Sequence, residues 1–401
     1  MKKFFRNTSG KVAESILFLS STSTSLIIIL IVIFLFKEGI SLFNEKPVEE
    51  GNILVVNKSN PVNELKSSTV KDIFDQNITN WESVTHKKDS IILVRIDDVF
   101  NYYTEEEIGS NFENLSTCIS DLVAKTPGII AFIPEKFFNK QSQGKIIKVR
   151  KVSIRDFFSG KEWMPTAHPA AQLGILPLLL GTLLVSLGAI IIALPFGLAS
   201  AIYLAEITDE SKRRVIKPLI ELLAGIPSVV YGFFGLVVIV PFIQNLFNLS
   251  VGETALSGSI VLAIMALPTI ITISEDALRT TPRSLKEASL SLGASKWQTI
   301  YRVVIPYAKS GITAGIILGI GRAIGETMAV LMVTGNAAVI PHTFLEPVRT
   351  IPATIAAELG EAPQGGLHFK ALFALGCILF IITLLINLSV QMSANRKTLK
   401  K

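Results

Sequence analysis

Two charged side chains stand four positions apart inside a long apolar stretch of the sequence. Arg322 and Glu326 belong to GRAIGETMAV, residues 321–330. The guanidinium of an arginine is a planar fork that suits the oxygens of an oxyanion, whereas a carboxylate accepts a hydrogen bond only from an anion that still carries a proton. Since a charge inside a bilayer costs several kcal/mol, the pair is a candidate station on an anion path. The structural alternative is an ion pair at i,i+4 spacing that neutralises itself.

The elements that must hold this pair are membrane helices. The chain of 401 residues is 49% hydrophobic and 17% charged, and its mean hydropathy of +0.51 is typical of an integral membrane protein. Six apolar stretches reach the length of about 20 residues that a membrane helix needs. They are Ile16–Phe36, Leu173–Ala205, Leu219–Leu246, Leu256–Ala277, Ile312–Val333 and Phe369–Val390. We therefore expect an all-α polytopic membrane domain with six transmembrane helices, five of them within residues 173–392.

A glycine repeat on the fifth stretch predicts which way the charged pair points. Gly311, Gly315 and Gly319 recur every four residues, which is typical of a helix face in close contact with another helix. At about 100° per residue, Arg322 and Glu326 fall within roughly 20° of Gly315 on the same face. The pair is therefore expected to point into the protein and away from lipid.

Lysine and arginine are unevenly distributed among the connecting segments. They cluster at the start of residues 1–43, ahead of the first stretch, and in the tail 393–401. They also cluster in the connection between the second and third stretches and in that between the fourth and fifth, but the segment between the third and fourth stretches has none. By the positive-inside rule both termini are expected to be cytoplasmic. The net charge of +6 thus indicates membrane topology and not a nucleic-acid partner. The first stretch lacks a small-residue cleavage site, so we expect it to remain as a helix.

Residues 44–165, between the first and second stretches, have the composition of a soluble domain. Strands are predicted at Ile53–Val56, Ile91–Val94 and Gly128–Ile133, and TVKDIF opens a helix. Alternating strands and helices favour an α/β module, and the topology places this insert on the outer side of the membrane.

The sequence contains no set of residues that indicates catalysis. It has no nucleophile–base arrangement, no HExxH, no CxxC and no GxxxxGK[ST] phosphate loop. Cys118 and Cys377 lie in different regions, so no disulfide is expected. We expect no metal, no cofactor and no enzymatic activity in this chain, and any use of ATP requires a separate subunit.

The connection between the fourth and fifth stretches, within residues 278–306, carries the most informative motif. EASLSLGASKWQTIYRVVIP, residues 287–306, resembles the cytoplasmic E-A-A loop of ABC-importer permeases. Four motif residues match and three are near substitutions: Glu287, Ala288, Gly293 and Pro306, then Ser289, Val303 and Ile305. The resemblance implies the type I ABC importer fold, in which this loop docks into a groove on the ATPase subunit. Gly293 allows the loop to fold back, because glycine adopts backbone conformations that are costly for other residues.

Other stretches resemble one particular group of ABC-importer permeases. Residues 177–206, 217–236 and 321–336 resemble the permeases of phosphate importers, and GETMAVLM together with FFSGKEWMP, residues 157–165, resembles the C-type subunit. The resemblance covers about two thirds of the chain. It implies a heterodimer with a second phosphate permease, an ATPase dimer and an extracytoplasmic phosphate-binding protein in the inner membrane of a bacterium. In that family the residues that match Arg322 and Glu326 are implicated in transport.

The insert departs from that family, whose members have a much shorter segment there. Two of its stretches, residues 55–84 and 126–137, resemble pieces of a phosphate-binding protein, but the expected Ser-Gly-Thr anion loop is missing. Its place is taken by RIDDVFNYYTEEE, residues 95–107, whose five carboxylates would repel an anion. We therefore hypothesise a degenerate binding-protein-like module that docks partners and does not bind phosphate. A plain spacer domain is the alternative.

Three functions remain open at this point. The first is the permease subunit of an ATP-driven phosphate importer, which forms half of the translocation pathway and couples to the ATPase through residues 287–306. The second is a permease for another oxyanion, such as molybdate or sulfate. The third is a membrane phosphate sensor, which needs no ATPase.

Overall fold

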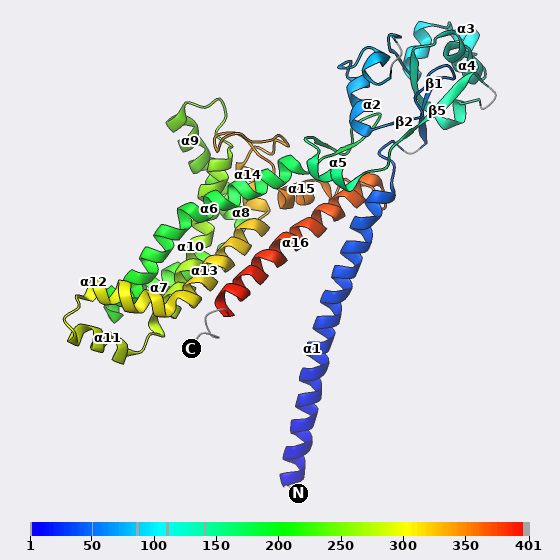
Figure 1. Cartoon of the computed structure of the whole chain (residues 1–401). Coiled ribbons are helices and arrows are strands. Elements are labelled where there is room, and N and C mark those ends of the chain that lie inside the picture. The colour runs from blue at the N-terminus through cyan, green and yellow to red at the C-terminus, as the bar shows by residue number, and fades with distance from the viewer. Residues whose placement is uncertain (1, 50, 86–87, 110–111, 140–141, 396–401) are drawn as a thin grey trace. The chain divides into compact units, whose positions relative to one another are not determined.

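The structure, a computed structural model, divides the chain into two compact units (Figure 1). It describes residues 2–49, 51–85, 88–109, 112–139 and 142–395. The first unit comprises Met1–Ile40, Pro177–Gln364 and Leu372–Lys401, and the second comprises Ser41–Leu176 and Gly365–Ala371. The basic residues predicted for the tail, from Arg396 onward, lie outside the described residues, and the side chains before Glu14 are not described either.

Six helical segments of the described residues are long and apolar enough to cross a membrane, as the sequence predicts. Three of them continue through a π-helical turn. The six segments are α1 (Lys2–Ser41); α6 (Leu176–Ile202) with the π turn Tyr203–Ile207; α8 (Ser228–Phe234), the π turn Gly235–Ile239 and α9 (Val240–Phe247); α10 (Ala255–Arg279); α12 (Lys296–Thr299), the π turn Ile300–Val304 and α13 (Ile305–Gly325); and α16 (Leu367–Asn395). Four further helices lie between them: α7 (Glu210–Ala224), α11 (Arg283–Ser291), α14 (Met328–Val333) and α15 (Ile351–Glu358).

The predicted third span, Leu219–Leu246, is wrong in its first third. The helix is interrupted after Ala224, and the membrane segment begins only at Ser228. Pro227 precedes α8 with an extended backbone (φ −59°, ψ 141°), and a proline disfavours the helical conformation of the residue before it. Residues 219–224 therefore belong to α7, none of whose residues is buried in the isolated chain.

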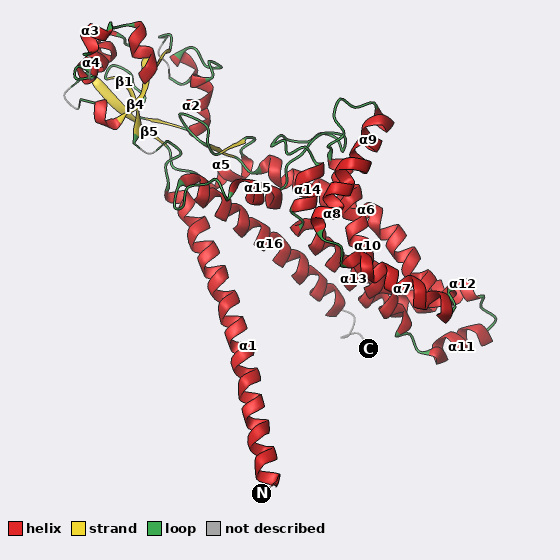
Figure 2. Ribbon diagram, turned by 180° about the vertical axis from the view of Figure 1, so that it is seen from behind, coloured by secondary structure: helices red, strands yellow, loops and turns green. Residues whose placement is uncertain are grey.

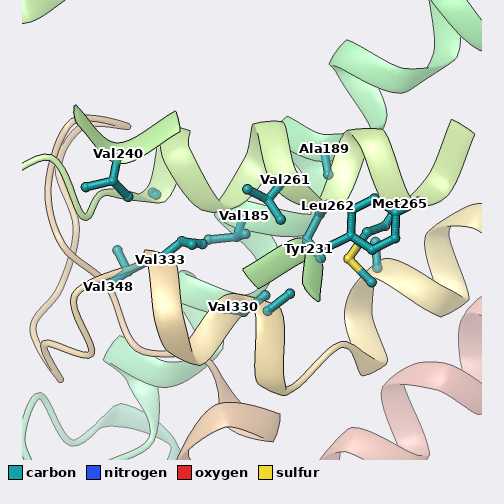
Figure 3. Close-up of a cluster of buried hydrophobic side chains, with 13 residues drawn as sticks. Val185, Ala189, Tyr231, Val240, Val261, Leu262, Met265, Val330, Val333 and Val348 are labelled. Atoms are coloured by element: carbon teal, nitrogen blue, oxygen red, sulfur yellow. The ribbon is translucent and has the colours of Figure 1, made fainter. Parts of the chain in front are cut away.

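Close contacts between small residues hold the membrane helices together. Side chains from α6, α8, α9, α10, α13 and α14 form one buried apolar cluster, shown in Figure 3. On α13, a β-carbon added at Gly311, Gly315 or Gly319 would press against Ala277, Ile273 or Ile270 of α10 respectively. The glycine repeat is thus confirmed as a close-packing face, and α10 is the helix that lies against it.

The second unit is an α/β module around a five-stranded sheet, as predicted (Figure 2). The strands are β1 (Asn52–Asn57), β2 (Glu64–Leu65), β3 (Ile92–Arg95), β4 (Ile129–Pro134) and β5 (Gly144–Val149), in the order β2-β5-β1-β4-β3. Strand β1 is antiparallel to β4 and β5, whereas β2 is parallel to β5 and β3 to β4. The helices are α2 (Ser67–Phe74), α3 (Glu105–Ile108), α4 (Leu115–Lys125) and α5 (Ile154–Ser159), and a short ribbon joins β6 (Trp163–Met164) to β7 (Gln172–Leu173).

Alternation along β1 gives this unit a core on each face of the sheet. Leu54 and Val56 belong to an apolar cluster with residues of α2, whereas Val55 belongs to a cluster with residues of α4. Successive side chains of a strand point to opposite faces, so a strand that is apolar at every position needs cover on both sides.

Candidate functional site

The segment that matches the E-A-A motif folds as two short helices joined by a tight turn. Helix α11 ends at Ser291, Gly293 adopts a left-handed backbone conformation with φ +86°, and α12 begins at Lys296. A β-carbon at Gly293 would meet no atom within 4 Å, so the glycine is required by the backbone alone. The turn folds the chain back on itself, as the motif predicts.

Side-chain hydrogen bonds fix the shape of this turn. Ser295 and Gln298 form a reciprocal capping box at the start of α12, with Ser295 N donating to Gln298 Oε1 over 2.8 Å. The hydroxyls of Ser289 and Thr299 lie 3.0 Å apart and join the two helices. The π-helical turn that ends at Val304 then leads directly to Pro306, a residue that disrupts regular helical hydrogen bonds.

The outer surface of the turn is apolar and exposed. Leu292, at its tip, is 89% exposed, and Trp297 and Tyr301 are 63% and 66% exposed. Glu287 and Ala288 are exposed on the neighbouring face of α11. Large apolar side chains grouped around a carboxylate on a rigid turn have the composition of a surface that docks another protein.

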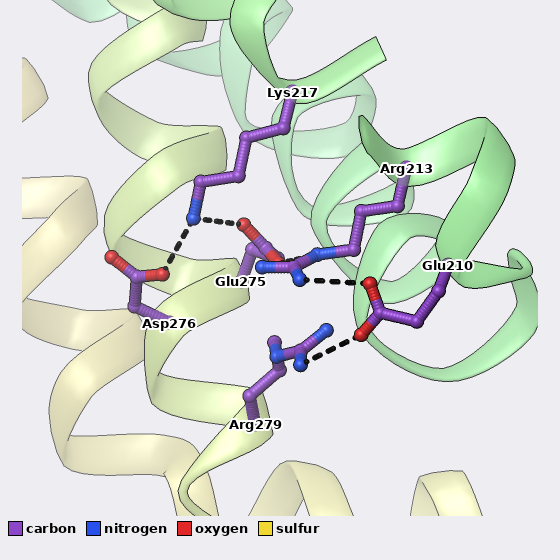
Figure 4. Close-up of polar contacts among 6 residues, drawn as sticks. All are labelled: Glu210, Arg213, Lys217, Glu275, Asp276 and Arg279. Atoms are coloured by element: carbon purple, nitrogen blue, oxygen red, sulfur yellow. Dashed lines mark hydrogen bonds and ion pairs between the residues drawn. The ribbon is translucent and has the colours of Figure 1, made fainter. Parts of the chain in front are cut away.

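An ion-pair network lies at the end of α10 that leads into this segment (Figure 4). Glu275 has no exposed surface, yet its two carboxylate oxygens lie 2.7 Å from Arg213 and 2.8 Å from Lys217, both on α7. Lys217 also contacts Asp276, while Glu210 joins Arg213 to Arg279. The network ties α7 to the C-terminal end of α10.

Burial and charge act in opposite directions on the basic members of the network. Burial lowers the pKa of Lys217, but hydrogen bonds to Asp276 and Glu275 outweigh it, so the pKa lies above its ordinary value. Burial also lowers the pKa of Arg213, but the hydrogen bonds to Glu275 and Glu210 and the charges of these carboxylates outweigh it, so the pKa lies above its ordinary value. The hydrogen bond from Arg279 lowers the pKa of Glu210. All three groups are therefore charged at neutral pH.

A second ion pair anchors α11 itself. Lys286 binds the carboxylate of Glu206, which lies in the π turn at the end of α6. Glu206, Glu275 and Asp276 each pair with a basic residue of a connecting segment. Through these contacts the turn around Gly293 is linked to three helices of the membrane unit, α6, α7 and α10.

The charged pair of the fifth stretch is not built as its spacing predicts. The predicted helix Ile312–Val333 is interrupted: α13 ends at Gly325, Glu326 is extended with ψ 133°, and α14 begins at Met328. Among the described residues, no ion pair or hydrogen bond joins Arg322 to Glu326. The i,i+4 geometry is therefore wrong, because the two residues do not share a helix.

Each member of the pair instead has its own surroundings. Arg322 is half-buried and lies near Tyr231 of α8. Glu326 is half-buried too, and its Oε1 accepts a hydrogen bond of 3.4 Å from Ala329 N in the first turn of α14. A break in a membrane helix exposes polar backbone groups, and such breaks are tolerated where protein or a polar pathway surrounds them.

Glu326 lies beside hydroxyl groups from two other segments. A narrow cavity, without room for a water molecule, is lined by Glu326, Thr182, Ser186 and Thr350. Thr182 Oγ1 also accepts a hydrogen bond of 2.9 Å from Ile351 N, at the start of α15. Apolar residues, among them Val185, Leu262 and Ile324, make up most of the remaining lining, so the carboxylate and the hydroxyls lie in a closed and largely apolar gap inside the membrane unit.

Sequence reasoning missed the short helix α15 and the hydroxyls beside Glu326. Thr350 caps α15 by accepting from Ala353 N, and Pro352 follows in its first turn. The run TIPAT was therefore an available signal for the start of a helix. Thr182 and Ser186 were hidden in an apolar stretch, where a hydroxyl usually bonds back to its own helix, as both of these also do.

Comparison with known proteins agrees with this arrangement. The family described as "Binding-protein-dependent transport system inner membrane component" matches residues 193–398, which is half of the chain. The chain belongs to this family. It is a multi-pass membrane protein and a transport permease subunit, and the matched residues contain the turn at Gly293, the ion-pair network and the break at Glu326.

Individual relatives extend the match beyond the family's shared region. The permease is 36% identical over 283 residues to a probable ABC transporter permease protein, YqgH, of Bacillus subtilis, covering 71% of this chain and 89% of the relative. It is 41% identical over 249 residues to the phosphate transport system permease protein PstC of Mesorhizobium japonicum, covering 57% and 75%. Among solved structures, an inward-facing MetNI methionine ABC transporter aligns with a TM-score of 0.42 at 19% identity, over 56% of this chain and 94% of that one.

Proposed function

We propose that this permease forms half of the translocation pathway of an ATP-driven phosphate importer. The other parts of the complex are a second phosphate permease, an ATPase dimer and an extracytoplasmic phosphate-binding protein. The observation that carries the proposal is the match to several proteins named PstC, at 38–41% identity over most of their length. Relatives named for another oxyanion are absent from the most similar ones, so molybdate or sulfate is the weaker alternative.

The turn at Gly293 is the proposed contact with the ATPase. Its exposed apolar tip and the carboxylate of Glu287 suit a groove on a partner protein. Ala288 and Pro306 shape the helices on either side of it. Since Lys286 is bound to α6, and since the turn is continuous with α10 and α13, a displacement of the turn moves the membrane helices.

The basic residues near the turn support the proposed topology. Arg213, Lys217, Arg279 and Lys286 gather at one end of the helices, next to the turn. Lysine and arginine at this end support a cytoplasmic location for it. With six spans, this orientation has both termini in the cytoplasm and residues 44–165 outside the inner membrane.

Arg322 and Glu326 are the proposed residues of the phosphate path. They are independent stations, because each has different neighbours and neither neutralises the other. Glu326 and the hydroxyls of Thr182 and Ser186 can exchange hydrogen bonds with a protonated phosphate, whereas a fully deprotonated sulfate has no proton to give to the carboxylate. The site is closed in this conformation, so the phosphate path opens there only when the helices move.

The insert is the proposed docking module for extracytoplasmic partners. Where a phosphate-binding loop is expected, the chain forms a short 3₁₀ helix, Ile96–Asn101, followed by α3. Phe100 and Tyr102 are about half exposed beside the carboxylates of Asp97 and Glu105. An acidic and aromatic surface repels phosphate but suits a basic protein surface.

Purification of the assembled complex tests the proposal. The tagged chain, isolated in mild detergent from its native membrane, is expected to bring a second permease and an ATPase that carries a phosphate loop. The Gly293→Pro variant, with a deformed turn, is expected to retain the second permease and lose the ATPase. If the wild-type chain is isolated without any ATPase, it is not an importer subunit.

A further inference from the structure

A cavity of about 400 Å³ lies in the second unit, between α2, α5 and the ribbon of β6 and β7. Five basic and three acidic side chains line it. Lys71 is neutralised by Asp75 and Glu162, at 2.8 and 3.1 Å. The cavity plays no part in the phosphate pathway proposed above.

With Asp72, Asp156 and Glu162 set against the five basic side chains, the lining keeps an excess of two positive charges. Arg150 has only a long and half-exposed contact of 3.5 Å with Glu64. Lys66, Lys151 and Lys161 are exposed, and none has an ion pair among the described residues. Several uncompensated ammonium groups around one cavity favour a ligand with a negative charge. The first turn of α2, with Ser67 and Ser68, also lines the cavity, and the backbone N–H groups that begin a helix add to this preference.

Two residues that line the cavity are close in sequence to membrane spans. Gly174 lines it and is two residues before α6, while Pro47 lines it and is three residues after the end of the first span at Asn44. A fully extended chain advances at most about 3.6 Å per residue, so these residues lie within about 11 Å of membrane helices. A bilayer with its headgroups exceeds its hydrocarbon core by about 10–15 Å in total, so each headgroup layer is about 5–7.5 Å thick, and this edge of the cavity lies within that layer or just outside it.

Apolar side chains flank the cavity on the same segment. Ile154 and Phe158 are 61% and 45% exposed and, at i,i+4 spacing, share one face of α5. The neighbouring Phe157 lines the cavity instead. Met164 of β6 is also half exposed. Exposed apolar residues beside lysines and arginines are typical of a segment that lies in the membrane interface.

We propose that this cavity binds the headgroup of an anionic phospholipid. Lys66, Lys151 and Lys161 contact the phosphate, and Ile154 and Phe158 lie among the upper parts of the acyl chains. The bound lipid holds the insert against the membrane surface. A free phosphate ion has the same charge chemistry, but it would not account for the apolar residues on α5 or for the position of the cavity next to two spans.

Lipid titration of the full-length chain in a neutral detergent, followed by native mass spectrometry, tests the proposal. The probes are phosphatidylglycerol, phosphatidylcholine and inorganic phosphate. Each lysine near a membrane surface contributes roughly fivefold to the binding of anionic lipid, so the triple variant Lys66→Gln, Lys151→Gln and Lys161→Gln is expected to bind one phosphatidylglycerol on the order of 100-fold more weakly. The matched control is Lys58→Gln, Lys125→Gln and Lys148→Gln, exposed lysines of the same unit outside the cavity, and it is expected to bind like the wild type.

Further measurements distinguish a loss of charge from a change in the fold, and the binding of a lipid from the binding of a free anion. The triple lysine-to-arginine variant at positions 66, 151 and 161 keeps the charge and is expected to retain the lipid. Inorganic phosphate in tenfold excess is expected to leave the lipid bound, and phosphatidylcholine is not expected to occupy the site. Equal binding of phosphatidylglycerol by the triple glutamine variant and its control overturns the proposal. Displacement by inorganic phosphate, or equal binding of phosphatidylcholine, overturns it as well.

Discussion

The carboxylate of Glu275, which has no exposed surface, lies 2.7 Å from the guanidinium of Arg213 across the contact between α10 and α7. The other carboxylate oxygen lies 2.8 Å from Lys217. One buried negative charge thus holds two positive charges of a helix that has no buried residue of its own. This carboxylate is the buried centre of the network that attaches α7 to α10, which the pairs Lys217–Asp276 and Glu210–Arg279 complete nearer the surface.

Replacing Glu275 with alanine is therefore expected to be strongly destabilising. Removal of one partner from a buried ion pair costs roughly 3 kcal/mol, and Arg213 and Lys217 would keep only the exposed carboxylates of Glu210 and Asp276. Thermal unfolding of the purified chain in detergent measures the effect. The adjacent Asp276→Ala is the matched control, since Asp276 is exposed and shares Lys217 with Glu275. A loss of stability no greater than that of the control would show that the network does not hold α7.

Glu210 makes the stabilising contribution of the network depend on pH in the acidic range. Its pKa is lowered from 4.5 by the hydrogen bond from Arg279, so the folded state favours the charged carboxylate. This contribution is complete above pH 4.5 and is lost as the pH falls through the lower pKa of the folded state. The protection of the α7 amides against hydrogen exchange, corrected for the intrinsic pH dependence of exchange, is expected to fall below pH 4.5 in the wild type. The Glu210→Gln variant lacks this titration, and an unchanged acid response in that variant would exclude Glu210 as its source.

The local features of this chain followed from its sequence more readily than its tertiary contacts. The glycine at position 293 predicted a turn because the motif demands a backbone that other residues avoid, and the structure has φ +86° there. The glycine repeat on α13 likewise predicted close packing. The partner of Glu275 is 62 positions away in the sequence, and no local pattern indicates such a pairing.

The break at Glu326 shows why the helix through the charged pair was mispredicted. The apolar run crosses residues 325–328 without a proline, and Gly325 alone is a weak signal. The helix ends because Glu326 adopts an extended conformation and its carboxylate accepts from the first turn of α14. Competition between a side chain and the backbone for the same N–H depends on the surrounding helices, so residue spacing alone does not reveal it.

Substitution at Gly293 is expected to uncouple ATP hydrolysis from transport. Alanine in the left-handed region costs about 1 kcal/mol or more and distorts the turn, although no neighbouring atom obstructs the methyl group. Gly293→Ala in the assembled complex is expected to lower phosphate uptake several-fold while the amount of permease in the membrane is unchanged. Gly360→Ala is the control, because that glycine is equally uncrowded and has no positive φ. Normal uptake by the Gly293 variant would argue against a shape-dependent contact.

Arg322 and Glu326 are expected to act independently. Since no contact joins them, the fold-reductions in phosphate uptake caused by Arg322→Gln and Glu326→Gln should multiply in the double variant. Uptake of radiolabelled phosphate is measured in four separate proteoliposome preparations, which contain the wild type, each single variant or the double variant. A double variant that is no worse than either single one would mean that the two residues work as a unit, as an ion pair does.

The central claim is that this chain carries phosphate when its partners hydrolyse ATP. Its most direct test is the uptake of radiolabelled phosphate by proteoliposomes that contain the chain, its second permease, the ATPase and the binding protein. Uptake is expected to require ATP, to fall several-fold when Arg322→Gln replaces the wild type in an intact complex, and to persist in an excess of sulfate or molybdate. ATP-dependent uptake of sulfate or molybdate in place of phosphate, or phosphate uptake that does not need ATP, would contradict the account.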